Sequence, residues 1–106
     1  MVRHMLAFMG LLSSDEASSR AAELPGWTLA DKAIQRKFTF RDFPEAVSFA
    51  VRVGFAAEAV DHHPDILINY KRVTLTFSTH SEGGLTEKDF AGAAAATKVA
   101  AVFGAT

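Results

Sequence analysis

Hydrophobic and polar residues alternate in two segments of the chain, and this period of two is typical of half-buried β-strands. In the first segment, residues 33–40, the mostly apolar side carries Ile34, Arg36, Phe38 and Phe40. In the second, residues 73–78, apolar side chains alternate with hydroxyl side chains in the order Val73, Thr74, Leu75, Thr76, Phe77, Ser78. Two shorter strands are expected at residues 27–29 and 66–69, each just before one of the longer strands.

Two helices are indicated by pairs of residues with the spacing of a capping box, in which a hydroxyl and a carboxylate satisfy each other's backbone N–H groups. Ser13 and Glu16 form one such pair, and Thr86 and Asp89 form the other. The first helix should end ahead of the Pro-Gly pair that follows it, because proline disfavours helical geometry in the preceding residue. The second should extend over residues 87–102, which are rich in alanine.

The longest predicted helix begins after Asp42, whose side chain can accept hydrogen bonds from the first turn. We expect it to run from Phe43 to Asp61 or His62. Followed in steps of three and four residues, its apolar side consists of Phe43, Val47, Ala50, Val51, Gly54 and Phe55. The same steps lead on to Glu58 and His62, so the buried side should become polar only in the last two turns. This pattern predicts an acid/base site at the end of the helix.

The predicted order of elements is helix, strand, strand, helix, strand, strand, helix. Short links favour antiparallel pairing within each pair of strands, and the apolar side of a sheet has to be covered by helices. The fold class is therefore α+β, with a four-stranded antiparallel sheet and the helices packed on one face. We expect a single domain over residues 1–106, in which residues 1–11 form an N-terminal arm.

Composition narrows the classes of function. The chain has 106 residues, a formal net charge of −1 and no cysteine, so disulfides, thiolate catalysis and cysteine-ligated zinc are excluded. Basic residues form only short pairs, which argues against a nucleic-acid partner. Residues 1–10 place a basic residue ahead of an apolar run, as signal peptides do, but the run is short and no cleavage pattern follows. No stretch reaches the ~20 apolar residues of a membrane span, so we expect a cytoplasmic protein that does not bind membranes.

Three of the four histidines lie between residues 62 and 80, with several carboxylates around them. Imidazole can donate or accept a proton near neutral pH, which suits general acid/base catalysis. Pro64 forces His63 out of helical geometry, so His62 and His63 can point toward a shared space. Each residue also has a simpler explanation: His62 could interact with the helix dipole, and His80 could be an ordinary surface residue at a strand end.

The pattern Glu58-x3-His62-His63-Pro64-x5-Tyr70-x9-His80-x8-Asp89 resembles that of the pterin-4a-carbinolamine dehydratases. The flanking segments agree with that family at Gly26-Trp27, at Arg36-x-Phe38-x-Phe40-x-Asp42-Phe43 and at Thr79-His80, so the resemblance covers roughly residues 12–93. It implies dehydration of a 4a-hydroxytetrahydropterin to the quinonoid dihydropterin without a metal or an organic cofactor. It also implies association into a homodimer or homotetramer.

The resemblance assigns proton transfer to His62, His63 and His80, and a border of the substrate site to Asp61 and to Ser78, Thr79 and Ser81. On chemical grounds we assign the base role to His63 and the acid roles to His62 and His80. Glu58 and Asp61 would orient the imidazoles, and Asp89 would hold the loop or a histidine.

Two other classes of function remain open. Glu58, His62 and His80 could ligate a catalytic zinc ion, since Glu58 and His62 are four residues apart on one helical face. Alternatively, the chain could be a binding or dimerisation module without catalysis, because members of the resembled family in animals also bind a homeodomain transcription factor.

Overall fold

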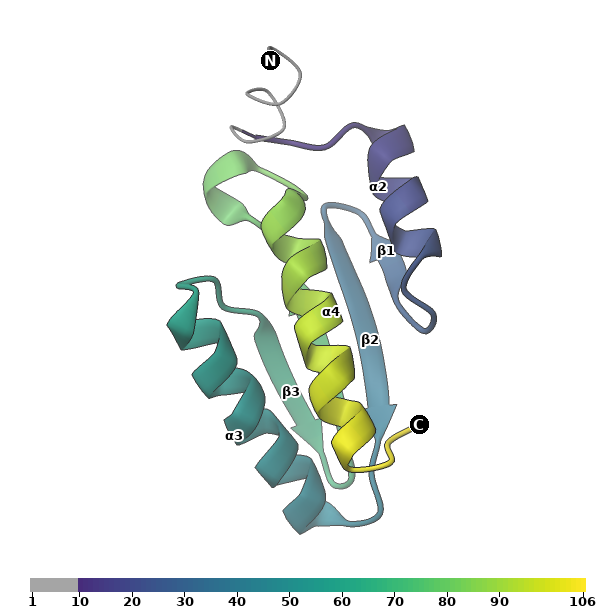
Figure 1. Ribbon diagram of the computed structural model, residues 1–106, viewed down its shortest axis with the longest axis vertical. Coiled ribbons are helices and arrows are strands. Elements are labelled where there is room, and N and C mark those ends of the chain that lie inside the picture. Colours follow the sequence, from purple (N-terminus) through teal and green to yellow (C-terminus); the bar gives the residue numbers. More distant parts are fainter. Residues whose placement is uncertain (1–9) are drawn as a thin grey trace.

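The computed structural model describes residues 10–106, and its elements follow the predicted order (Figure 1). They are α2 (Ser14–Ala22), β1 (Thr28–Ala30), β2 (Ala33–Thr39), α3 (Phe43–Ala59), β3 (Asp65–Asn69), β4 (Arg72–Phe77), the 3₁₀ turn η1 (His80–Glu82) and α4 (Glu87–Val102). The strands form one antiparallel sheet in the order β1-β2-β4-β3. The predicted α+β fold is confirmed. Most of the expected N-terminal arm, residues 1–9, lies outside the described residues.

Helices α3 and α4 lie side by side over one face of the sheet, and α2 lies beside β1 (Figure 1). The core between the layers is built on aromatic rings, with Phe49 of α3 centred 5.0 Å from Phe38 and 4.8 Å from Phe40. Trp27 is buried against the same cluster, and its indole N–H donates to Thr97 Oγ1 at 2.9 Å. No helix among residues 10–106 combines the length and the apolar character needed to cross a membrane.

Both predicted capping boxes are present, which fixes where α2 and α4 begin. In α2 the Glu16 N–H donates to Ser13 Oγ at 3.1 Å, and the Ser13 N–H donates to Glu16 Oε1 at 2.8 Å. Arg20 in the last turn of α2 forms an ion pair with Glu87 in the first turn of α4. The hydrogen bonds to Glu87 raise the pKa of Arg20 above its ordinary value.

The apolar stripe predicted for α3 is wrong. The residues that face the core are Ala46, Phe49, Val53 and Ala57. Phe43, Val51 and Phe55 instead point to solvent, and Phe55 is 74% exposed. The helix is therefore apolar on two sides, and only one of them packs on the core. The helix also ends at Ala59, earlier than expected, so His62 lies beyond it. Glu58 is within the helix but on its exposed side, so neither residue continues a buried stripe.

Gly92 lies where α4 crosses β4, and it leaves room for the ring of Phe77. A Cβ atom built on Gly92 would stand 2.5 Å from Phe77 Cε1, a distance that real Cβ atoms do not show. Gly54 in α3 is the opposite case, because a Cβ atom there would meet nothing within 4 Å. One helical glycine is therefore required by packing and the other is not.

We predict that Gly92→Ala lowers the free energy of unfolding by about 1–3 kcal/mol, since the buried Phe77 ring has to move. Gly54→Ala is the matched control and should raise it by about 0.5–1 kcal/mol, because alanine favours helix and meets no obstacle. Urea unfolding of both variants measures the difference. Stabilisation by both substitutions would show that the packing of α4 on Phe77 is looser than described.

Candidate functional site

The candidate site lies at the end of the sheet where β3 begins and β4 finishes. Asp65 of β3 pairs with Thr76 of β4, so the segments flanking this pair, residues 60–64 and 78–82, come together at one end of the sheet. Figure 1 shows the loop after α3 and the turn η1 at this same end. The first segment carries His62 and His63 and the second carries His80, as the sequence predicted.

The chain reverses sharply after α3, and this reversal turns His62 inward. Asp61 adopts a left-handed conformation with φ of 52°, the usual way to end a helix although glycine is the common residue for it. The His62 N–H donates back to the carbonyl of Ala57 at 3.1 Å. As a result, the His62 side chain is only 12% exposed, while Asp61 itself lies at the surface.

His62 is held by a buried carboxylate. Its Nε2 atom lies 2.7 Å from Oδ1 of Asp89, whose side chain is fully buried in the first turn of α4. The other carboxylate oxygen, Oδ2, accepts hydrogen bonds from Thr79 Oγ1 at 2.8 Å and from the Thr86 N–H at 2.9 Å. The imidazole also stacks on Phe77, with ring centroids 6.2 Å apart and planes inclined by 22°. The ring is thus fixed in position and orientation, with Nδ1 as the nitrogen left for a ligand.

His63 and Glu58 form a second, exposed pair. Their side chains are joined at 2.8 Å from His63 Nε2 to Glu58 Oε1 and are 53% and 79% exposed. The sequence predicted that Glu58 would continue the buried side of the helix toward His62. It lies on the outer side instead, because the packed side of α3 runs through Val53 and Ala57, and it bonds to His63 there.

His80 opens the turn η1 on the facing segment and is exposed. It lines a hollow of about 280 Å³ whose other walls include Asp65, Thr76 and Ser78. The hydroxyl of Ser78 donates to the carbonyl of Lys32 at 2.7 Å, and Ser81 is exposed beside it. Thr79 differs from these neighbours, since it is buried and directed toward Asp89.

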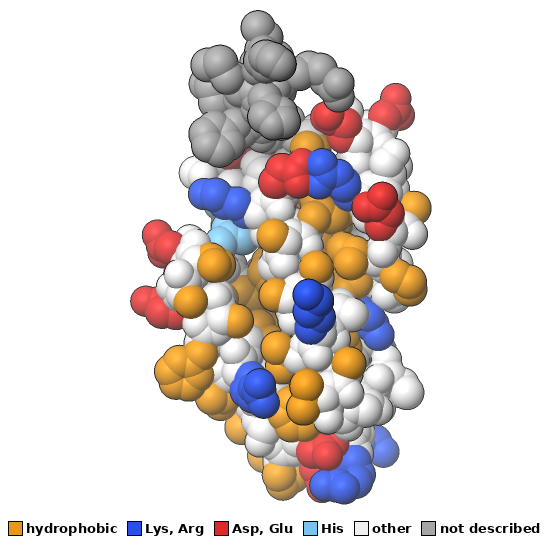
Figure 2. All heavy atoms as spheres, in the orientation of Figure 1, with side chains coloured by type: hydrophobic (Ala, Val, Ile, Leu, Met, Phe, Trp, Pro, Cys, Tyr) orange, Lys and Arg blue, Asp and Glu red, His pale blue; other side chains and the backbone are white. Residues whose placement is uncertain are grey.

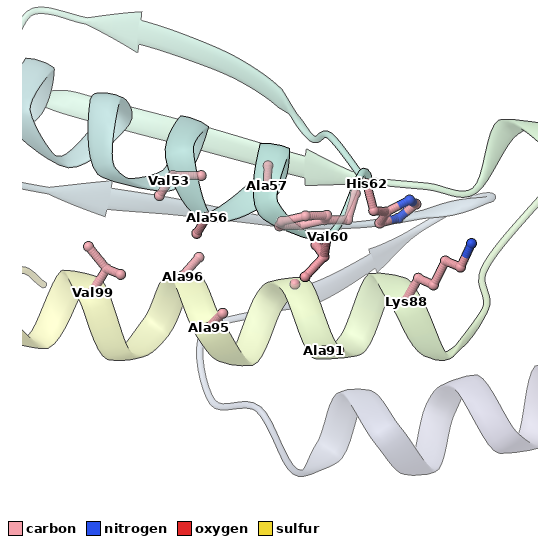
Figure 3. A pocket seen from close by; sticks show the side chains of 12 residues that line it. Val53, Ala56, Ala57, Val60, His62, Lys88, Ala91, Ala95, Ala96 and Val99 are labelled. Atoms are coloured by element: carbon pink, nitrogen blue, oxygen red, sulfur yellow. The ribbon is translucent and has the colours of Figure 1, made fainter.

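An apolar groove of about 190 Å³ runs between α3 and α4 and ends at His62. Figure 3 shows Val53, Ala56, Ala96 and Val99 along its length, with His62 and Lys88 together at one end. Figure 2 shows hydrophobic side chains gathered over α3 and α4 on this face of the molecule. One face of His62 therefore borders an apolar hollow while its edge is held by Asp89.

The predicted site residues thus fall into three sets that meet at one corner: the buried cluster of His62, Asp89 and Thr79, the outer pair of His63 and Glu58, and the segment around His80. Among residues 10–106 no three His, Asp or Glu side chains are grouped so as to hold a metal ion. The zinc set of Glu58, His62 and His80 is not assembled, since His62 bonds to Asp89 and Glu58 bonds to His63.

The sequence did not identify three residues that shape this site: Phe77, Thr86 and Lys88. Thr86 was recognised only as a helix cap, and Phe77 only as a buried strand residue. Their part in the site depends on contacts between segments distant in sequence, for which no local pattern exists.

Comparison with known proteins agrees with the geometry. Residues 10–99 match the family model described as pterin 4 alpha carbinolamine dehydratase. A protein of Chloroflexus aurantiacus is 48% identical over 91 residues, which cover 86% of this chain and 98% of the relative. One of Afipia carboxidovorans is 50% identical over 99 residues, covering 91% and 99%. Both relatives carry the provisional name pterin-4-alpha-carbinolamine dehydratase.

A crystal structure from Brucella melitensis, of a protein described as a transcriptional coactivator/pterin dehydratase, shares the fold. Its TM-score is 0.81 at 38% sequence identity, and the match covers 84% of this chain and 97% of that one. With the matching family model, these relatives and the corner of histidines, the chain belongs to the pterin-4a-carbinolamine dehydratase family.

Proposed function

We propose that the protein converts a 4a-hydroxytetrahydropterin into the quinonoid dihydropterin and water, the step that recycles tetrahydrobiopterin. The observation that carries this proposal is the fixed imidazole of His62, held by the buried carboxylate of Asp89 beside two exposed histidines. Imidazoles grouped in this way can donate a proton to one atom of a bicyclic substrate and accept a proton from another, as general acid/base catalysis needs.

The reaction is a pair of proton transfers. The bond between C4a and the hydroxyl oxygen breaks as the oxygen takes a proton and leaves as water. The neighbouring nitrogen loses its proton, and its electrons form the new C=N bond. One group must donate a proton and another must accept one, so the protein returns to its starting state once the two are exchanged. Neither transfer calls for a metal or an organic cofactor.

In this proposal His63 is the base and His62 and His80 are the acids. Glu58 accepts a hydrogen bond from the ring of His63 and would hold that ring in position. His62 would act as an acid in its doubly protonated form, with the Nε2 hydrogen bonded to Asp89 and the Nδ1 hydrogen presented to the substrate. Asp61, Ser78 and Ser81 would border the substrate at the surface.

We predict that His62→Ala, His63→Ala and His80→Ala each lower kcat/KM by about 10²–10⁴-fold, the usual loss when a positioned acid or base is removed. The measurement is the turnover of chemically generated 4a-carbinolamine, followed by ultraviolet absorbance. Ser18→Ala on α2, which is exposed and lines neither the hollow at His80 nor the groove at His62, is the control and should keep full activity. A folded His63→Ala variant that works at the wild-type rate would refute the base assignment.

A second candidate is a non-catalytic binding module, because the related Brucella melitensis protein is described as a coactivator as well as a dehydratase. The exposed apolar side of α3, with Phe43, Val51 and Phe55, offers a surface for a protein partner. The same assay separates the candidates. A folded wild-type protein without any turnover of the carbinolamine would favour the binding module.

We also propose that the protein forms a homodimer or homotetramer. The observation that supports this is again the exposed side of α3, because large apolar side chains that no part of the described chain covers are typical of association surfaces. The edge strand β3 adds exposed Ile66 and Leu67. An unpaired, apolar strand edge is a second surface on which copies of a chain can associate.

Light scattering coupled to gel filtration tests the association. Wild type should elute as a dimer or tetramer, and Phe55→Asp should shift it toward smaller species, since the charge would be buried at a contact between copies. Ser18→Asp adds the same charge on α2 and should leave the mass unchanged. A monomeric wild type, or a Phe55→Asp variant of unchanged mass, would contradict the use of this face.

A further inference from the structure

We infer that Thr79 is a positioning residue that couples His62 to His80 through Asp89, and that its hydroxyl does not touch the substrate. The inference rests on the proposed function, because it assigns a role within the same site. It differs from the role indicated by the sequence, where Thr79 was placed among the residues that border the substrate.

The hydroxyl of Thr79 is hydrogen-bonded to buried side chains. The residue is 5% exposed, and Oγ1 lies 2.8 Å from both Asp89 Oδ2 and Thr86 Oγ1. A hydroxyl has a single hydrogen to donate. Since this hydrogen goes to the carboxylate, the hydroxyl of Thr86 must donate to Thr79, and the hydrogen bonds run in one direction from Thr86 through Thr79 to Asp89.

Asp89 depends on these donors because it is fully buried. A carboxylate can only accept hydrogen bonds, and a buried carboxylate that lacks donors destabilises the folded state. Oδ2 receives two of its bonds from Thr79 and the Thr86 backbone, and these bonds leave Oδ1 directed at His62 Nε2, 2.7 Å away. Without the Thr79 hydroxyl, the carboxylate would rotate to recover a donor, and the imidazole would lose its fixed partner.

The backbone of Thr79 also holds the turn that carries His80. Its N–H donates to the carbonyl of Gly84 at 2.9 Å, and its own carbonyl accepts from the N–H groups of Glu82 and Gly83, each at 3.0 Å. Thr79 is therefore bonded on one side to the carboxylate that orients His62 and on the other to the turn that starts at His80. Thr86 shares the buried bonds, but it also caps α4, so its substitution would mix the two effects.

The experiment compares Thr79→Val with Thr79→Ser. Valine keeps the branched shape and removes the hydroxyl, whereas serine keeps the hydroxyl. For Thr79→Val we expect kcat to fall about 10- to 100-fold with KM nearly unchanged, because a misplaced catalytic group costs rate rather than binding. Thr79→Ser should recover most of that loss.

A second readout does not depend on activity. Nitrogen-15 NMR of the histidine side chains should show a hydrogen on His62 Nε2 in wild type whether the ring is charged or neutral. In Thr79→Val the neutral ring should become a mixture of tautomers. His63, which is bonded to Glu58 instead, is the internal control and should not change. If wild type fails to turn over the carbinolamine, the proposed function falls, but the tautomer shift still decides whether Thr79 holds His62 through Asp89.

Three results would overturn the inference. One is a Thr79→Val variant with wild-type kcat and an unchanged His62 spectrum. Another is a rise in KM at constant kcat, which would mean that the hydroxyl binds the substrate. The third is measured on wild type, so it applies even if Thr79→Val does not fold. The hydroxyl proton of Thr79 should exchange slowly with water, and rapid exchange would show that it is not hydrogen-bonded to Asp89.

Discussion

The site depends on a single buried carboxylate that has to be surrounded by donors. Asp89 is removed from water, and a charge in that position is tolerated only when hydrogen bonds replace its hydration. The donors come from the end of α3 through His62, from the end of β4 through Thr79, and from the start of α4 through Thr86. Removing one partner of such a buried pair costs about 3–5 kcal/mol, which exceeds the ~1 kcal/mol of an ordinary hydrogen bond. The three segments are thereby held at one point.

The same carboxylate also begins a helix, so the geometry of the site is tied to a boundary of the fold. Asp89 closes the capping box of α4 through the Thr86 N–H, while its other oxygen holds the imidazole. Three residues further on, Gly92 lets α4 approach Phe77, and Phe77 supports the face of His62. The ring is therefore oriented by a hydrogen bond from the first turn of α4 and by a stacking contact that the second turn permits. Movement of α4 along its axis would disturb both.

The elements that sequence predicted well are those fixed by neighbours in the chain. The capping boxes and the alternating strands depend on residues a few positions apart, and the bounds of α4 agree with the prediction over residues 87–102. The side of α3 that packs could not be predicted in this way, because Phe55 and Phe49 lie on different sides of a helix that is apolar on both. Periodicity locates an apolar side, but it does not tell whether the same chain covers it.

The candidate site was likewise predicted only as far as local sequence patterns allow. The spacing of the histidines predicted that His62, His63 and His80 lie near one another, and their segments do meet at one end of the sheet. The sequence did not say which carboxylate would bond to which histidine. Glu58 was expected on the buried side of the helix, but it lies on the exposed side and bonds to His63. Asp89 was expected to cap the helix and to hold the loop or a histidine, and its bond to His62 depends on a contact between residues 27 positions apart. Such a contact leaves no trace in local sequence.

Under the proposed function, the unequal burial of the two adjacent histidines suits them to different roles. His62 is nearly enclosed and held by a carboxylate that cannot move, so it suits a group that must meet one atom of the substrate in a fixed direction. His63 and Glu58 are both largely exposed, so a proton taken by His63 can pass directly to water after each cycle. A base has to lose its proton before the next turnover, and exposure makes that exchange fast. The proposed roles, with His63 as the base and His62 as the fixed acid, thus match the different environments of two residues that are neighbours in the chain.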